Sequence, residues 1–305
     1  MSVPDFQTIM LPLLVIMGDG AEHSLAEVID ILGDRMGLSP EEKKELLPSE
    51  SDVKFDNRVR WAAFYLRKAE LLERTGRGKI RITQRGRQVL EKNPEKINVG
   101  FLRQFPEFLD FQQGTRRTVA EEDGVEGAIE EPEATPEETL EASYLNLRQT
   151  LAQELLDRVK KCPPKFFERL VVDLLVSMGY GGSRKDAGQA IGQSGDEGID
   201  GIIKEDKLGL DVVYLQAKRW EATVGRPVVQ AFAGSLEGQR ARKGVLITTS
   251  QFSQDAKDYV SRIEKKIILI GGEELAQLMI DYGIGVTELR TYSVRKMDLD
   301  YFEEE

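Results

Sequence analysis

Three acids and three glycines share the seven residues GDEGIDG, Gly195 to Gly201. A glycine lets the backbone bend sharply or approach another group closely. Carboxylates crowded into so short a stretch repel one another unless a positive group neutralises them. We therefore expect a cation, either a metal ion or a basic side chain, to lie beside Asp200.

The stretch DVVYLQAKRW, Asp211 to Trp220, alternates as a strand does. Alternation divides its side chains between two faces, with Val213, Leu215 and Ala217 on one and Tyr214, Gln216 and Lys218 on the other. If GIDGII pairs with this strand as a hairpin, Asp200 comes close to Gln216 and Lys218. A carboxylate, an amide oxygen and an ammonium group would then meet at one strand end.

These groups suit the hydrolysis of a phosphodiester. We expect Asp200 to bind Mg²⁺, with Mn²⁺ as a substitute, because these ions take carboxylate, carbonyl and water oxygens. The Gln216 side chain and the Ala217 carbonyl supply further oxygens. A bound metal ion lowers the pKa of a water ligand and neutralises phosphate charge. Lys218 would position or deprotonate that water, or stabilise the charge of the transition state.

Structural alternatives exist for the same residues. Asp200 could be a turn residue, and Lys218 could be a surface lysine. Thr248, Thr249 and Ser250 close the strand GVLITTS, where they could contact phosphate or cap the next helix.

The part of the chain around these residues predicts an α/β domain with a mixed sheet covered on both faces. Its expected elements are a helix over 163–180, strands over 198–203 and 210–220, a helix over 226–243 and a strand over 244–250.

The N-terminal part predicts helices followed by a basic hairpin. The helix over 54–74 has a buried stripe of Phe55, Val59, Ala62, Ala63 and Leu66. Basic and polar residues on its other faces and on the hairpin form a candidate DNA-binding set: Asn57, Arg58, Arg60, Trp61, Arg67, Lys68, Arg74, Arg77, Lys79 and Arg81. This order resembles a winged helix, whose third helix enters the major groove. A helical domain with solvated charges, or one that contacts proteins, is the alternative.

Charge is divided unevenly along the chain. The net charge is −11, yet residues 119–141 hold ten acids and no base, while residues 54–92 hold twelve Lys or Arg and four acids. Local charge decides where a polyanion binds. We expect a DNA-binding domain over 1–115, an acidic linker over 116–142 and a catalytic domain over 143–305. The linker is a spacer by composition, or competes with DNA for the basic stretch.

Composition also excludes several kinds of site. The chain has one cysteine, Cys162, and one histidine, His23. They cannot form an internal disulfide, a cysteine zinc cluster or a multi-histidine metal site, and a catalytic triad is not expected. This usage favours a reducing compartment, and we expect the cytoplasm. No apolar run approaches the roughly 18 residues that span a bilayer.

GDEGIDG followed by QAK resembles the Mrr-type branch of the PD-(D/E)xK nuclease superfamily. The resemblance continues through FERLVVDLLVSMGYGG, VGRPVVQAFAGSLEGQ and GVLITTSQFS. It implies an α-β-β-β-α-β core with the acid on the second strand and the lysine on the third. It also implies a type IV restriction enzyme, a nuclease that cuts double-stranded foreign DNA carrying methylated bases.

The resemblance assigns a role to each candidate catalytic residue. It makes Asp200 the metal-binding acid and Lys218 the catalytic lysine, and it places Gln216 where most members have an acid. It further implies that the supporting groups are Asp196, Glu168 and Gln230. Alternatively, Asp196 is an acid that organises its loop, Glu168 is a solvated helix acid and Gln230 is an ordinary polar helix residue. Because Gln216 lacks a charge, metal affinity should be lower unless another acid compensates.

The sequence therefore predicts a DNA endonuclease that acts as a homo-oligomer, a dimer or larger, because one active site cuts one strand. Two alternatives remain open. One is a DNA-binding regulator or scaffold with an inert nuclease domain. The other is a structure-specific repair or junction nuclease.

Overall fold

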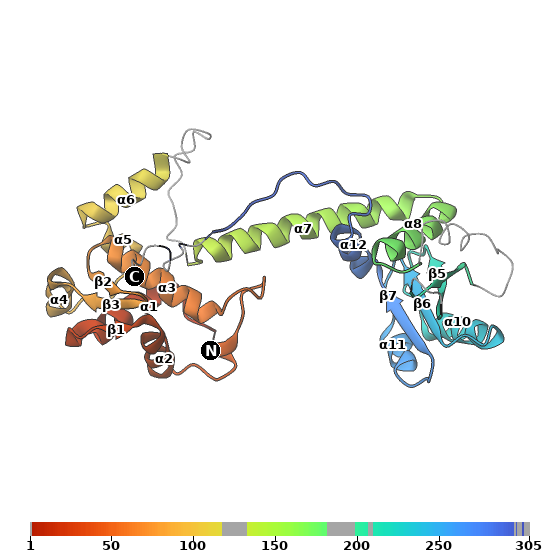
Figure 1. Cartoon of the computed structure of the whole chain (residues 1–305), viewed down its shortest axis with the longest axis horizontal. Coiled ribbons are helices and arrows are strands. Elements are labelled where there is room, and N and C mark those ends of the chain that lie inside the picture. Colours follow the sequence, from red (N-terminus) through yellow and green to blue (C-terminus); the bar gives the residue numbers. More distant parts are fainter. Residues whose placement is uncertain are drawn as a thin grey trace. The chain divides into compact units, whose positions relative to one another are not determined.

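The computed structural model describes residues 2–117, 133–181, 199–206, 210–295, 297 and 301 (Figure 1). The chain divides into two compact units. The first comprises Met1–Leu145 with Arg295–Glu305, and the second comprises Asn146–Val294.

The first unit is mainly helical and carries a small antiparallel sheet. Its elements are α1 Phe6–Ile16, η1 Met17–Asp19, β1 His23–Ser24, α2 Leu25–Arg35, η2 Glu42–Lys44, α3 Lys54–Lys68, β2 Leu72–Gly76, β3 Lys79–Ile82, α4 Gln84–Glu91, α5 Val99–Leu102, α6 Pro106–Arg117 and the start of α7 Pro136–Lys161. Strands β2 and β3 form the predicted hairpin, and β1 adds a short third strand in the order β1-β3-β2.

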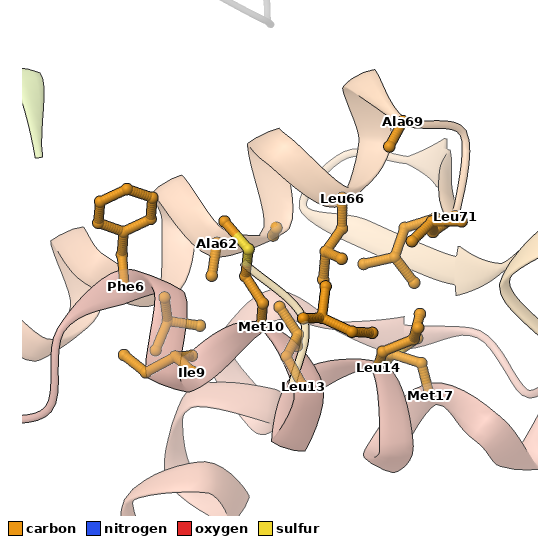
Figure 2. Close-up of a cluster of buried hydrophobic side chains, with 14 of the residues drawn as sticks. Phe6, Ile9, Met10, Leu13, Leu14, Met17, Ala62, Leu66, Ala69 and Leu71 are labelled. Atoms are coloured by element: carbon orange, nitrogen blue, oxygen red, sulfur yellow. The ribbon is translucent and has the colours of Figure 1, made fainter. Parts of the chain in front are cut away.

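Helices α1 and α3 enclose the core of the first unit. Figure 2 shows Phe6, Met10 and Leu13 of α1 beside Ala62 and Leu66 of α3, and all five are fully or almost fully buried. The stripe predicted on α3 is buried throughout, which confirms its orientation. Of the candidate DNA-binding set on α3, Arg60 and Lys68 are exposed, whereas Asn57 is buried and Trp61 packs against the core.

The second unit is built on a mixed sheet, as predicted, and four of its strands lie within the described residues. Its elements are the rest of α7, α8 Pro164–Ser177, β4 Gly201–Lys204, β5 Val212–Lys218, α10 Arg226–Gly238, β6 Lys243–Thr248, α11 Gln254–Val260, β7 Lys266–Ile270 and α12 Gly272–Asp281. The strand order is β4-β5-β6-β7, with β4 antiparallel to β5 and the other pairs parallel. Proline at the first position of α8 has a backbone angle that suits a helix start.

Helices cover both faces of this sheet (Figure 1). Val213 and Leu215 of β5 pack in one cluster with α8, α12 and the end of α7. Tyr214 packs in the other cluster, with α10 and α11. This division confirms the predicted alternation along β5 and assigns Gln216 and Lys218 to the face that α10 covers.

Two expected features differ or fall outside the description. Between α8 and α10 the described residues form two strands, β4 and β5; the further strand of the α-β-β-β-α-β order would fall within 182–198, outside them. Helix α7 begins at Pro136, so residues 136–142 of the expected linker are helical.

No helix among the described residues is long and apolar enough to cross a membrane.

The start of α12 packs so closely that only glycine fits. A Cβ at Gly272 would lie 2.5 Å from the Thr249 carbonyl oxygen and 2.9 Å from Leu156 Cδ1. We expect Gly272→Ala to lower the free energy of unfolding of the second unit by about 1–3 kcal/mol. Urea unfolding followed by Trp220 fluorescence, in a Trp61→Phe background, measures this change.

Gly234 within α10 is the matched control, because a Cβ there meets no atom within 4 Å. Gly234→Ala should raise stability by about 0.5–1 kcal/mol, the usual gain for alanine inside a helix. Equal stability of the two variants would show that the close approach at Gly272 is wrong.

Candidate functional site

Asp200 directly precedes β4 and is tied to β5 by two hydrogen bonds. Its backbone N–H donates to the Leu215 carbonyl at 2.8 Å, and its Oδ2 accepts from the Ala217 N–H at 2.7 Å. The ladder pairs Gly201 with Leu215, so Asp200 lies opposite Gln216. Residues directly opposite in an antiparallel pair share one face. The predicted hairpin therefore does bring Asp200 against the strand that carries Gln216 and Lys218.

Gln216 and Lys218 lie near the C-terminal end of β5, on the same face. Gln216 is buried, with 5% of its surface exposed, and Lys218 is half-buried. On the other side of β5, the parallel strand β6 pairs Lys218 with Thr248. The end of β5 is thus held between two strands.

Three consecutive hydroxyl residues at the end of β6 hold the last residue of β5 and the segment that follows it. Thr248 Oγ1 donates to the Lys218 carbonyl at 2.8 Å, Thr249 Oγ1 to the Trp220 carbonyl at 2.8 Å and Ser250 Oγ to the Glu221 carbonyl at 3.0 Å. The next helix, α11, is capped by Ser253. The expectation that Thr248, Thr249 or Ser250 caps that helix is therefore wrong, because their hydroxyls bind the backbone of the β5 side.

The supporting residues are placed separately. Glu168 lies half-buried on α8, which packs on the Val213 face of the sheet, and Gln230 lies exposed on α10, which packs on the opposite face. Asp196 lies outside the described residues. The structure thus brings Asp200, Gln216, Ala217 and Lys218 together. The catalytic and metal-binding roles of these four residues, like those of Asp196, Glu168 and Gln230, stay predictions.

The donor atoms at this corner are oxygens. Asp200 contributes a carboxylate, Gln216 an amide oxygen and Ala217 a backbone carbonyl, a set that suits a hard divalent cation. Within the described ranges, no three His, Cys, Asp or Glu side chains converge on a metal position. A metal ion here would be held by one carboxylate and neutral oxygens.

A pocket of about 370 Å³ opens directly beyond Lys218. It is lined by Lys160, Arg219, Trp220, Glu221, Ala222 and Thr249. Arg219 Nη1 donates to the Lys160 carbonyl at 2.6 Å, which joins the loop after β5 to the end of α7. Sequence reasoning missed both basic residues. Arg219 directly follows QAK and could have been found, whereas no local pattern links Lys160 to this loop.

The hairpin of the first unit presents basic residues that already have partners. Arg74 Nε donates to the Gly76 carbonyl at 2.9 Å, and Arg81 pairs with Glu73 at 2.6 Å. Lys79 pairs with Glu22 at 2.7 Å, and this hydrogen bond raises the pKa of Lys79. Arg77 is exposed at the turn. All four basic hairpin residues of the candidate DNA-binding set are exposed. Glu22 and Glu73 offset the positive charges of Lys79 and Arg81.

The C-terminal half of α3 carries Arg67 and Lys68. Burial lowers the pKa of Arg67, which is half-buried. The Lys68 ammonium lies 5.4 Å from the Phe64 ring centre and 5.1 Å from that of Phe111, within cation–π range. These two residues belong to the predicted DNA-binding set and lie toward the hairpin end of α3.

The N-terminal half of α3 differs from the expectation. Asn57 is buried, with 1% of its surface exposed, rather than lying on an open polar face. Arg58 pairs with Glu138, Trp61 Nε1 donates to Glu137, and Arg60 pairs with Asp52. The start of α7 covers Asn57 and Arg58. Its Glu137 carboxylate accepts a hydrogen bond from Asn57, and its Glu138 carboxylate pairs with the charge of Arg58.

Comparisons with known proteins match two separate parts of the chain. A family model described as a restriction endonuclease matches residues 159–279, and one described as the Mrr N-terminal domain matches residues 6–92. The chain is 35% identical over 308 residues to the type IV methyl-directed restriction enzyme EcoKMrr of Escherichia coli strain K12, covering 99% of this chain and all of that protein.

One solved structure is a weaker match. It is the MspJI restriction endonuclease in complex with a 27-mer oligonucleotide, 20% identical with a TM-score of 0.26. The match covers 68% of this chain and 51% of that chain.

The Thr248 hydroxyl supports the strand end that carries Lys218. Its side chain is fully buried. Thr248→Val keeps the shape but leaves the Lys218 carbonyl without this donor, so we expect the free energy of unfolding of the second unit to fall by about 1–3 kcal/mol. Thr223→Val, at an exposed position, should change it by less than about 0.5 kcal/mol. Urea unfolding compares the two, and equal effects would contradict the role of the hydroxyl.

Proposed function

The chain belongs to the Mrr family of restriction endonucleases, and from this we propose that it cuts double-stranded DNA carrying methylated bases by Mg²⁺-dependent hydrolysis. The methyl specificity is supported by the name of its relative, a type IV methyl-directed restriction enzyme. The family relationship makes the chain a nuclease homologue, and PD-(D/E)xK restriction enzymes generally use a divalent metal ion.

One observation carries the proposed active site. The Asp200 carboxylate accepts the Ala217 N–H at 2.7 Å, and the ladder places Asp200 opposite Gln216. Two hydrogen bonds therefore hold the acid in place before any ligand binds. Such preorganisation lowers the cost of orienting charged groups during a reaction.

We assign metal binding to Asp200, Gln216 and the Ala217 carbonyl. A divalent ion held there would acidify a bound water and neutralise phosphate charge. Gln216 contributes an oxygen without a charge, which reduces electrostatic attraction to the ion. Asp196 and Glu168 are proposed to supply further negative charge, and Gln230 a polar contact.

Lys218 is proposed to act on the phosphate and on the attacking water. Its ammonium group donates hydrogen bonds and carries a positive charge that stabilises the additional negative charge of the transition state. The hydrogen bonds from Thr248 Oγ1 and the Thr249 N–H to the Lys218 carbonyl hold the backbone from which this side chain extends. Lys160 and Arg219 line the adjoining pocket and add positive charge for the DNA backbone.

The first unit is proposed to bind the DNA duplex as a winged helix. Arg74, Arg77, Lys79 and Arg81 of the hairpin and Arg67 and Lys68 of α3 supply phosphate contacts, which position a protein on DNA. We propose residues 1–115 as this reader, 116–142 as the connection and 143–305 as the nuclease. Because one site cuts one strand, the active form is proposed to be at least a dimer in the cytoplasm.

A plasmid-cutting assay with Mg²⁺ tests the proposed activity. Wild-type protein should cut methylated plasmid and leave unmethylated plasmid intact. Asp200→Asn and Lys218→Ala should each lower the rate by at least about 100-fold, the usual loss when an acid–base or electrostatic group is removed. Chelation of the metal ion should stop cutting in every case.

Each alternative has a distinct result in the same assay. Equal cutting of both plasmids would remove methyl specificity. Full activity of Asp200→Asn would show that the assigned site is wrong. Binding of DNA without any cutting would favour a regulator or scaffold with an inert nuclease domain.

DNA affinity measured at several salt concentrations tests the hairpin. Arg77→Ala should weaken binding and reduce the slope of log K against log salt by about 0.9, because one fewer phosphate is neutralised. Lys96→Ala removes the same charge from an exposed position outside the hairpin and α3. Its slope should equal that of the wild type. An unchanged slope for Arg77→Ala would contradict a phosphate contact there.

A further inference from the structure

The start of α7 makes a set of polar contacts with the N-terminal half of α3. Glu137 Oε2 accepts from the Asn57 amide and, at 3.3 Å, from Trp61 Nε1. Glu138 Oε1 accepts from Arg58 Nε at 2.9 Å and lies 2.8 Å from Arg58 Nη2. Both carboxylates therefore bind donors that belong to the predicted DNA-binding set.

The pair formed by Arg58 and Glu138 is largely shielded from water. The exposed fraction of the Arg58 side chain is 14% and that of Glu138 is 10%. Arg58 Nη1 also donates to the Val3 carbonyl at 2.6 Å. A guanidinium so enclosed needs its carboxylate, because an unpaired charge at this depth is costly. Arg58 must therefore either stay paired with Glu138 or bind another anion in its place.

A capping box orders the acidic segment for this contact. The Thr135 N–H donates to Glu138 Oε2 at 2.8 Å, and the Glu138 N–H donates to Thr135 Oγ1 at 3.2 Å. Thr135 Oγ1 donates to Asn57 Oδ1 at 2.9 Å, and Thr135 is fully buried. Glu141 adds a contact from the next turn, where its Oε2 accepts the Ser49 N–H at 3.1 Å.

Residues 135–141 lie outside the matched N-terminal family domain, which ends at residue 92. In their contacts to α3 and Ser49, the carboxylates of Glu137, Glu138 and Glu141 accept hydrogen bonds. Water or another anion can take the place of these carboxylates. A phosphate offers the same negatively charged oxygens to Arg58, Asn57 and Trp61 as the two carboxylates do.

We propose that residues 135–141 are an autoinhibitory latch that occupies the N-terminal half of α3 in competition with the DNA backbone. This inference rests on the proposed DNA binding of the first unit. With the latch closed, DNA reaches the hairpin and the C-terminal half of α3. Full seating of α3 requires Glu137 and Glu138 to leave, which exposes Arg58 to phosphate.

The size of the effect follows from the fraction of molecules with the latch open. Apparent DNA affinity is the intrinsic affinity multiplied by that fraction. If the latch is open in about one molecule in ten, releasing it raises affinity about tenfold. The gain should be largest for short duplexes that one first unit can fill.

The first test removes the latch charges from the full-length protein. Glu137→Gln with Glu138→Gln keeps the side-chain size and an oxygen for the capping box, and it should raise affinity for a short duplex about tenfold. Glu154→Gln with Glu264→Gln is the matched control, because it removes two charges from exposed positions. Circular dichroism melting checks that each variant is folded.

The second test closes the latch. Ser49→Cys with Glu141→Cys, in a Cys162→Ser background, places one thiol on each side of the contact, and a short bismaleimide joins them. The cross-linked protein should bind the duplex at least about tenfold more weakly than the same protein before cross-linking, because the open fraction falls towards zero.

The outcomes separate the latch from the proposed function. Equal affinities of the latch and control variants, together with unchanged binding after cross-linking, would overturn the latch while leaving DNA binding intact. A failure of wild type and all variants to bind the duplex would overturn the proposed DNA-reading role of the first unit, and the latch with it.

Discussion

The hydrogen bond between the Asp200 carboxylate and the Ala217 N–H closes the end of the β4–β5 ladder, and the candidate active site depends on it. The ladder pairs Gly201 with Leu215, which places the acid opposite Gln216. A slip of one residue would turn Asp200 to the opposite face, because side chains alternate along a strand. The apolar residues beside it prevent that slip. Ile203 of β4 is buried in one cluster with Val213 and Leu215 of β5, so the register that buries Ile203 also gathers the site.

Much of this arrangement could be predicted from local patterns. Alternation in DVVYLQAKRW assigned Gln216 and Lys218 to one face, since a strand buries every second side chain. The stripe on α3 was also predicted, because helical spacing determines which residues enter the core. Local patterns do not determine which distant backbone groups meet. The Thr248 bond to the Lys218 carbonyl and the proximity of Lys160 to Arg219 arise from the packing of the sheet.

The expected linker shows a different limit of composition. Its many acids and two prolines indicate a spacer, yet α7 begins there at Pro136. Proline and glutamates suit the first turn of a helix, and Thr135 with Glu138 is a capping box that could have been found in the sequence. That Asn57 would be buried could not be read from α3 alone, because its partners lie about eighty residues further along the chain. Glu137 and Glu138, near the middle of the chain, thus accept hydrogen bonds from Asn57, Trp61 and Arg58 of the first unit.

The most direct test of the proposed site is a Mn²⁺ titration followed by electron paramagnetic resonance. Wild type, Asp200→Asn and Gln216→Glu would be compared. We expect Asp200→Asn to bind Mn²⁺ at least about tenfold more weakly and Gln216→Glu about tenfold more tightly, a change of about 1.4 kcal/mol for a charge lost or gained beside the ion. Equal Mn²⁺ affinity in all three folded proteins would show that the corner between Asp200 and Gln216 does not hold the metal ion.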